Sequence, residues 1–133
     1  MRYHYNLRSL FNETVTRFSD RIALRLSDKD YSYSQLDEAS NVLASFLQSR
    51  SVALGDVVAI VSTKCFEDYA LMIACLKIGA TYTNIDIDNP ADRIKTILHA
   101  CLPKIIFSKQ DKLEILECAL QAKIPCVNYE TVS

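Results

Sequence analysis

From residue 52 onward, short apolar runs alternate with longer stretches of helical periodicity. Continuous apolar runs between turn residues predict strands buried on both faces, whereas apolar residues three and four apart predict helices. The expected strands cover residues 57–61, 81–87, 104–107 and 124–127, and the expected helices cover 66–78, 90–101 and 111–122. This alternation predicts an α/β fold, with a predominantly parallel sheet joined by right-handed crossovers and flanked by helices.

The first third of the chain has a different pattern. An amphipathic helix is expected over residues 6–18, strands over 21–27 and 31–33, and a long helix over 34–49. Ser34 is the expected N-cap of the long helix, with Asp37 completing a variant capping box. No repeat, low-complexity stretch or linker interrupts the sequence. We therefore expect residues 1–133 to form a single α/β unit.

Further boundary signals lie in the second half. Helix 66–78 is apolar nearly all round and should be deeply buried, and Gly79 is its expected left-handed C-terminal residue. Asn89 followed by Pro90 predicts an N-cap and first helical position. Pro125 favours an edge position for the last strand.

Composition excludes several classes of function. A net charge of −1 argues against nucleic-acid binding and against a polybasic membrane surface. The longest apolar run, residues 69–76, is too short to span a bilayer. Gly55 and Gly79 are the chain's 2 glycines, so neither glycine-rich phosphate-binding motif can be written in it. A dinucleotide-binding oxidoreductase fragment is therefore disfavoured.

The chain has five cysteines, an odd number, and no C-x-x-C pair. Its first residues lack a secretory apolar segment, so we expect reduced thiols in a cytoplasm. None has neighbours that predict a reactive thiolate. The cysteines are Cys65, Cys75, Cys101, Cys118 and Cys126.

Two stretches carry a family resemblance. YSYSQLDEASNVLASFLQSRSVALGDVVAI resembles the pattern (L/Y)(T/S)Y-x-E-L, A/S-N-x-L-A-x-x-L, G-V-x-x-G-D-x-V-A, and LKIGATYTNIDIDNPADRI resembles L-K-A-G-A-A-Y-V-P-(I/L/V)-D-P-x-x-P-x-x-R. These patterns are the N-terminal signature of the AMP-forming adenylating enzymes, which include acyl-CoA synthetases, nonribosomal peptide synthetase adenylation domains and D-alanine–carrier protein ligases. The matching residues are Tyr33, Leu36, Asn41, Leu43, Ala44, Leu47, Val52, Gly55, Asp56, Val58, Ala59, Leu76, Lys77, Gly79, Ala80, Tyr82, Asp86, Pro90 and Arg93.

The resemblance covers residue 7 to about 108, roughly the first quarter of such an enzyme. It implies the first subdomain of an adenylation (AMP-binding) domain. The parent would use Mg-ATP to activate an amino or acyl acid as an adenylate and then pass it to a thiol, on coenzyme A or a phosphopantetheine carrier protein. The family's phosphate loop and catalytic lysine lie downstream of the matched region. We therefore expect this chain to act as a scaffold, and we assign it no catalytic, cofactor-binding or metal-ligating residue.

The chain departs from the family pattern at three positions. Ser51 stands where a glycine usually precedes the valine, at some cost in backbone strain. Asn84 and Ile87 replace two expected prolines.

Four groups of polar or aromatic residues are candidate sites. Asp86, Asp88 and Asp92 surround a turn, but Pro90 breaks the calcium-loop pattern, and a helix N-terminus explains carboxylates there. Ser62-Thr63-Lys64 follows a parallel strand, where a solvated loop is the simpler interpretation. His4 and His99 have no partner in sequence and are expected at the surface. The seven tyrosines are scattered and form no stacking platform.

A rival hypothesis remains open. The chain could be a stand-alone interaction module that forms a homodimer or docks on another protein through an open sheet edge.

Overall fold

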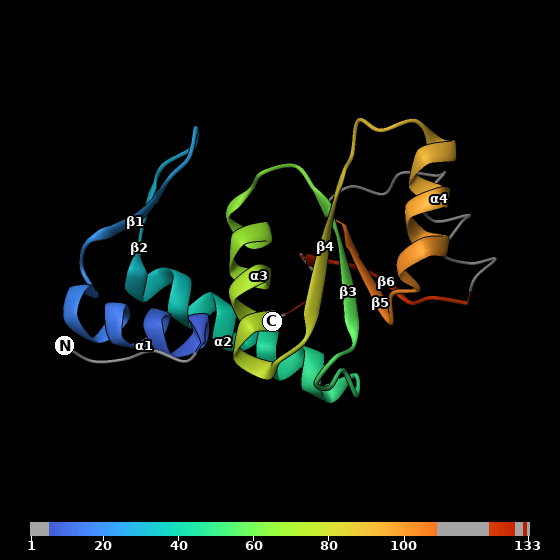
Figure 1. Cartoon of the computed structure of the whole chain (residues 1–133). Helices are drawn as coiled ribbons and strands as arrows, with labels where there is room; N and C mark the ends of the chain where they lie inside the picture. The colour runs from blue at the N-terminus through green and yellow to red at the C-terminus, as the bar shows by residue number, and fades with distance from the viewer. Residues whose placement is uncertain (1–5, 109–122, 130–131, 133) are drawn as a thin grey trace.

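The computed structural model describes residues 6–108, 123–129 and 132. The expected helix 111–122 and the residues Tyr3, His4, Tyr5 and Cys118 lie outside this part of the chain. The elements are α1 (Leu7–Phe18), β1 (Ile22–Arg25), β2 (Asp30–Ser32), α2 (Tyr33–Ser49), β3 (Val57–Ser62), α3 (Phe66–Ile78), β4 (Thr81–Asp86), α4 (Ala91–Cys101), β5 (Ile105–Ser108) and β6 (Cys126–Asn128). The predicted α/β fold with a parallel sheet is confirmed (Figure 1).

The main sheet has the strand order β4-β3-β5-β6, and every pair in it is parallel. Strand β3 is central because it pairs with both β4 and β5. The chain therefore runs outward from β3 to β4 and then crosses over to β5 on the other side. Strand β6 is an outer strand, as Pro125 predicts, and the carbonyl of Pro125 accepts a hydrogen bond from the Ile106 amide at 2.9 Å.

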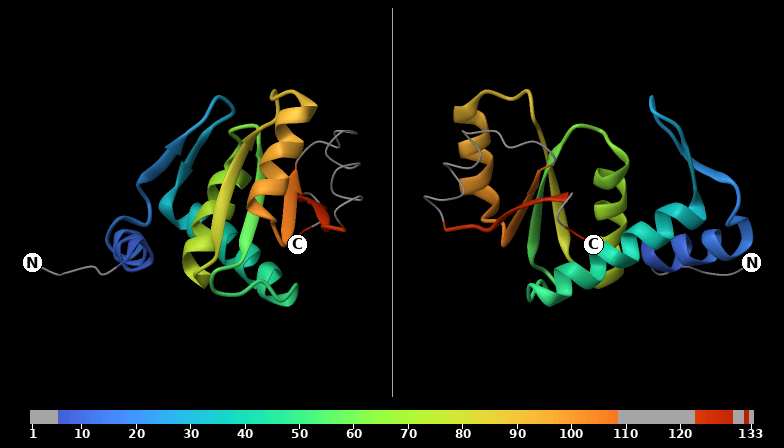
Figure 2. Two further views of the ribbon diagram at one scale, coloured as in Figure 1. Left: turned by 45° about the vertical axis from the view of Figure 1, so that its right-hand side comes forward. Right: turned by 180° about the vertical axis from the view of Figure 1, so that it is seen from behind.

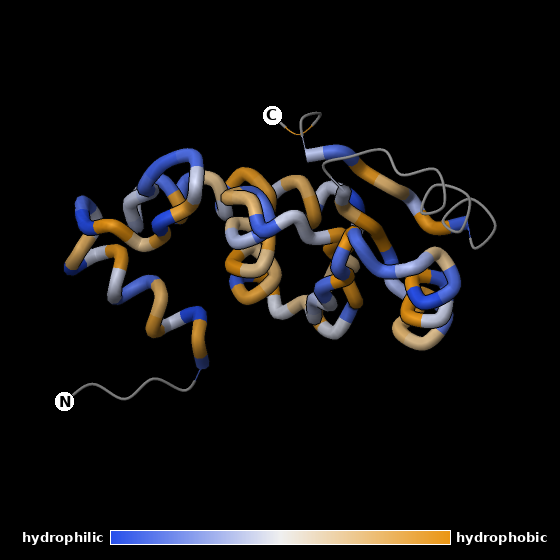
Figure 3. Tube along the Cα trace, turned by 90° about the horizontal axis from the view of Figure 1, so that it is seen from above, coloured by the Kyte–Doolittle hydropathy of each residue, from blue (hydrophilic) through white to orange (hydrophobic). Residues whose placement is uncertain are grey.

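Helices cover both faces of this sheet, α2 and α3 on one side and α4 on the other, and α1 packs against α2 and α3 (Figures 1 and 2). Side chains alternate along the strands: Val58 and Ile60 join the core beneath α2 and α3, whereas Ala59 and Val61 join the core beneath α4. This two-sided burial explains the uninterrupted apolar run of β3. Hydrophobic segments accordingly recur along α3 and the strands in Figure 3.

Strands β1 and β2 form a separate antiparallel pair beside the helices. It contacts the rest of the chain through Ala23 and Leu24, which pack against the main core, and through Tyr31, whose ring stacks on Phe66 of α3 at 4.1 Å between centroids. Helix α1 lies next to this hairpin and has no buried residue. Helix α1 and the β1–β2 hairpin therefore pack against the outside of the core.

The N-cap of α2 is Ser32, so the prediction of Ser34 is wrong. Ser32 Oγ accepts from the Gln35 amide at 3.1 Å, and Gln35 Oε1 accepts from the Ser32 amide at 2.8 Å. This reciprocal capping box satisfies two helix-end amides at once. Asp37, the expected partner of Ser34, instead pairs with Lys77.

Helix α4 begins one residue later than expected, and the prediction of Asn89 as its N-cap is wrong. Pro90 occupies the N-cap position without a side-chain hydrogen bond. The Asn89 amide donates to the Asp86 carbonyl at 3.1 Å, which closes a turn before the helix starts.

Two further expectations concern the helices. Gly79 ends α3 in the left-handed conformation with φ of 76°, as predicted. The expectation that α3 is deeply buried holds for one face only, because Phe66, Tyr69 and Met72 remain partly exposed. No helix in the described residues is long and apolar enough to cross a membrane.

Candidate functional site

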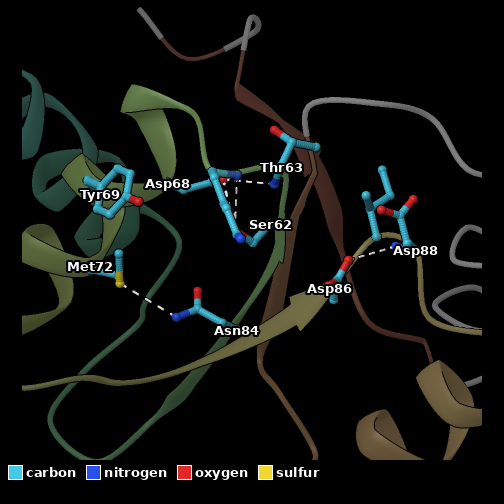
Figure 4. Close-up of a pocket in the computed structure, with 10 residues that line it drawn as sticks. Ser62, Thr63, Asp68, Tyr69, Met72, Asn84, Asp86 and Asp88 are labelled. Carbon is cyan, nitrogen blue, oxygen red and sulfur yellow. Dashed lines mark hydrogen bonds between the residues drawn. The ribbon is translucent and has the colours of Figure 1, made fainter. Parts of the chain in front are cut away.

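The carboxyl ends of β3 and β4 border a hollow of about 660 Å³. The loop Ser62-Thr63-Lys64, a candidate from the sequence, forms one side of it, and Asn84, Asp86 and Asp88 form the other (Figure 4). Tyr69 and Met72 of α3 complete the lining. The two strand-end segments are thus brought together because parallel strands end at the same edge of a sheet.

Asp68 of α3 organises this edge, and sequence reasoning missed it. Its side chain is 1% exposed. Oδ2 accepts hydrogen bonds from the Thr63 amide at 3.0 Å, Ser62 Oγ at 3.2 Å and the Cys65 amide at 3.3 Å. Oδ1 accepts from the Tyr129 hydroxyl at 2.8 Å. The available signal was an acidic residue three positions after Cys65, the spacing of a capping box.

The Asp68 carboxylate determines what the start of α3 can bind. A helix N-terminus offers unpaired amides to anions. Here the amides of Thr63 and Cys65 already donate to the chain's own carboxylate. A phosphate in this position would compete with Asp68 for donors and would be repelled by its charge. These two amides are therefore already satisfied within the chain.

Tyr129 lies buried beside strand β5, next to the start of α3. A doubly wound sheet binds ligands where its strand order reverses, which here is between β3 and β5. Tyr129 is 6% exposed, and the centre of its ring lies 5.4 Å from that of Phe107 in β5. Its hydroxyl donates to Asp68 in the first turn of α3. Burial and the Asp68 charge raise the pKa of Tyr129. Tyr129 is thus a buried, neutral phenol that joins β5 to the start of α3.

Asp86, Asp88 and Asp92, the candidate cation ligands, do not converge on one point. Asp86 Oδ1 accepts from the Asp88 amide at 2.9 Å, and both residues border the hollow. Asp92 lies in the first turn of α4, as expected, and does not line the hollow. Across residues 6–108, 123–129 and 132, no group of three or more His, Cys, Asp or Glu side chains is arranged to hold a metal ion.

The remaining candidates take structural positions. His99 lies exposed in the last turn of α4, as predicted. Burial raises the pKa of the Cys75 thiol to about 12, and burial also raises the pKa of Cys65 and Cys101. A raised pKa means less thiolate and lower reactivity.

Lys77 connects the two stretches that carry the family resemblance, residues 31–60 and 76–94. Its Nζ donates to Asp37 Oδ1 at 2.7 Å, Asn41 Oδ1 at 2.7 Å and Ser40 Oγ at 2.8 Å. The Lys77 side chain is only 11% exposed. One ammonium of α3 therefore holds three acceptors of α2, on the side of the molecule away from the hollow.

The chain matches the model of the AMP-binding enzyme family over residues 11–132. The chain belongs to this family. It is 31% identical over 111 residues to tyrocidine synthase 1 of Brevibacillus parabrevis, covering 84% of this chain and 10% of that protein. It is 36% identical over 87 residues to bacitracin synthase 1 of Bacillus licheniformis, covering 65% of this chain and 2% of that protein.

Two solved structures share the fold of this chain. The N-terminal subdomain of Klebsiella oxytoca NpsA, in complex with 3-hydroxybenzoyl-AMSN, superposes with a TM-score of 0.80 at 27% identity, over 96% of this chain and 31% of that chain. VinN, in complex with L-aspartate, superposes with a TM-score of 0.86 at 11% identity, which shows the fold alone. The predicted family and the predicted subdomain fold are both confirmed.

Three further residues of the family signature, Gly55, Asp56 and Gly79, also connect neighbouring elements. The Gly55 amide donates to the Gly79 carbonyl at 3.0 Å, and the Thr81 amide donates to the Asp56 carbonyl at 2.8 Å. The Asp56 carboxylate accepts from the Ala53 amide at 2.8 Å and lies 3.3 Å from Lys104 Nζ. These contacts join the α2–β3 loop to the start of β4. Most signature residues thus act through packing rather than by lining the hollow.

Proposed function

We propose that this chain is the scaffold of the N-terminal part of an AMP-forming ligase. In the proposed reaction the whole enzyme activates an amino or acyl acid with Mg-ATP as an adenylate, releases pyrophosphate and passes the acyl group to a thiol. The observation that carries the proposal is the family match over residues 11–132. The chain spans 31% of the NpsA subdomain chain and 10% of tyrocidine synthase 1, so this activity is proposed for the whole enzyme.

The chemistry of the carboxyl edge supports a scaffold role. Among the residues that the structure describes, Lys64 is the one cation lining the hollow, and Asp86 and Asp88 line its other side. The amides at the start of α3 are bonded to Asp68. A triphosphate needs several unpaired donors and an excess of positive charge. The described residues therefore do not fit Mg-ATP, and no step of the reaction is assigned to them.

The proposed partners are the rest of the adenylating enzyme and a phosphopantetheine carrier protein. One solved relative is NpsA-ThdA, an artificially fused adenylation–PCP di-domain that covers 98% of this chain at 26% identity. The fusion of an adenylation domain to a PCP in that protein supports a carrier protein as the partner whose thiol accepts the acyl group.

Two measurements test the proposal. Isothermal calorimetry of this chain with Mg-ATP, alone and with amino, aryl and fatty acids, should give no saturable heat up to millimolar ligand. Saturable binding would contradict the scaffold role. Grafting residues 11–132 in place of the matched third of the NpsA N-terminal subdomain, within complete NpsA, should retain carboxylate-dependent ATP–pyrophosphate exchange. NpsA itself is the control, and a folded graft without exchange would overturn the proposal.

A further inference from the structure

The β3–α3 loop, residues 63–65, has a strained backbone at its middle residue. Lys64 adopts φ of 61°, in the left-handed region that a residue with a side chain rarely occupies. Such a conformation persists only where neighbouring contacts hold it in place. The Lys64 side chain is exposed, so the contacts that hold the loop are those of its backbone.

One buried carboxylate holds all three amides of this loop. Asp68 Oδ2 accepts from the Thr63 amide at 3.0 Å and from the Cys65 amide at 3.3 Å. It also accepts from Ser62 Oγ at 3.2 Å, and that hydroxyl oxygen accepts from the Lys64 amide at 3.2 Å. The closed loop therefore depends on Asp68, and the closed loop in turn helps to keep Asp68 away from water.

The second oxygen of Asp68 is bonded to the far end of the described chain. Oδ1 accepts from the Tyr129 hydroxyl at 2.8 Å. Tyr129 directly follows β6, an outer strand of three residues that pairs with β5. A short strand with one partner among the described residues has few bonds to break. We therefore expect β6 to detach at a lower free energy than the centre of the sheet.

Loss of the Tyr129 hydroxyl would favour an open loop for two reasons. A buried carboxylate oxygen without its donor carries a large desolvation penalty, and opening the loop returns Asp68 to water. Opening also releases the strained backbone of Lys64. While Tyr129 is bonded, the penalty is absent and the loop amides keep their bonds to the carboxylate. The position of β6 thus biases the loop between two states.

We propose that Tyr129 is a latch on the β3–α3 loop: docked β6 holds the loop closed, and detached β6 lets it open. The open loop frees the Thr63 and Cys65 amides and moves Lys64, which lines the hollow at the carboxyl edge of the sheet. The latch therefore couples the outer strand to the shape of the hollow. This inference rests on contacts within the chain and does not depend on the proposed ligase function.

Amide hydrogen exchange across a urea series tests the latch without any variant. The Ile106 amide donates to the Pro125 carbonyl at 2.9 Å, so its exchange reports the detachment of β6, whereas the Thr63 and Cys65 amides report opening of the loop. All three should give matching opening free energies that change little with urea, because local opening exposes little surface. A loop opening free energy clearly different from that of Ile106, or a urea dependence as steep as that of the central β3 amides, would overturn the proposal.

Two tyrosine substitutions provide a second test. Tyr129→Phe keeps the ring beside Phe107 and removes the hydroxyl. The Thr63 and Cys65 amides should then exchange faster in the absence of urea by about tenfold or more, the effect of a lost hydrogen bond to a charged group. Tyr69→Phe is the control, because it removes a hydroxyl from α3 that makes no hydrogen bond among the described residues, and it should leave both amides unchanged. Circular dichroism checks that each variant is folded. Unchanged exchange in Tyr129→Phe, or equal acceleration in both variants, would show that there is no latch.

Discussion

Lys77 shows how one residue can hold three elements together. Its ammonium pairs with Asp37 of α2 at 2.7 Å and lies 5.4 Å from the centre of the Phe11 ring of α1. Because the side chain is nearly buried, removing its charge leaves a carboxylate and two polar groups without their donor.

Lys77→Met should therefore lower the free energy of unfolding by about 2–3 kcal/mol. The matched control is Arg25→Met, because Arg25 and Asp30 form an exposed pair at 3.9 Å whose loss should cost below about 0.5 kcal/mol. Urea denaturation followed by circular dichroism measures both. Equal effects of the two substitutions would contradict the role assigned to Lys77.

Asp56 gives the stability of the protein a dependence on pH. The hydrogen bond from the Ala53 amide, assisted by Lys104, lowers the pKa of this carboxyl below its ordinary value of 3.8. A lowered pKa in the folded state stabilises the protein above the unfolded pKa, and this contribution is lost as pH falls through the folded value. Asp56→Asn removes the contribution. The difference in unfolding free energy between the two proteins should then shrink as pH falls from about 5 through the lowered pKa of Asp56, and a constant difference would contradict this account.

At the scale of elements, α2 and α3 end in the same geometry with different residues. The Val52 amide donates to the Leu47 carbonyl and the Ser51 amide to the Gln48 carbonyl, a complete Schellman motif. Ser51 adopts φ of 62°, as its place in the family's glycine position predicts, and Gly79 adopts 76°. A side chain at positive φ is strained, so the serine carries a penalty that the glycine avoids.

Ser51→Gly should raise the free energy of unfolding by about 1 kcal/mol, and Gly79→Ala should lower it by about 1–2 kcal/mol. A Cβ on residue 79 would also lie 2.5 Å from Leu54 Cδ1, but Leu54 is 83% exposed and can move aside. Thermal and urea unfolding compare the two variants directly. Changes of the same sign would show that packing, and not backbone conformation, dominates at these helix ends.

At the scale of the whole molecule, the bond between Tyr129 and Asp68 joins groups 61 residues apart. Both side chains are buried, so Tyr129→Phe leaves Asp68 Oδ1 without this donor. We expect a loss of about 2 kcal/mol in unfolding free energy. Tyr69→Phe is the control, because Tyr69 lies on the same helix and makes no hydrogen bond through its hydroxyl among the described residues. A loss as large in the control would contradict the assignment.

The outline of the fold was predictable because strand and helix periodicities are local. The run 57–61 and the turn at Gly79 are read directly from neighbouring residues. Asp68 was not predictable in this way, since its most distant partner, Tyr129, approaches only after the sheet has assembled. Ser32 and Ser34 are equally suitable helix caps by residue type. What distinguishes Ser32 is its reciprocal hydrogen bonding with Gln35, which is seen only in the structure.

The two separate sheets make local unfolding of one of them possible. No strand is shared between the β1–β2 hairpin and the main sheet, and an isolated hairpin is marginal in water. Helix α1 contributes no buried residue to hold it. The first sheet can therefore detach while the four parallel strands stay paired, at a free energy well below that of global unfolding. A protease that cleaves after basic residues would find Arg21, Arg25 and Lys29 in this segment, and would cut there while the parallel core is still intact.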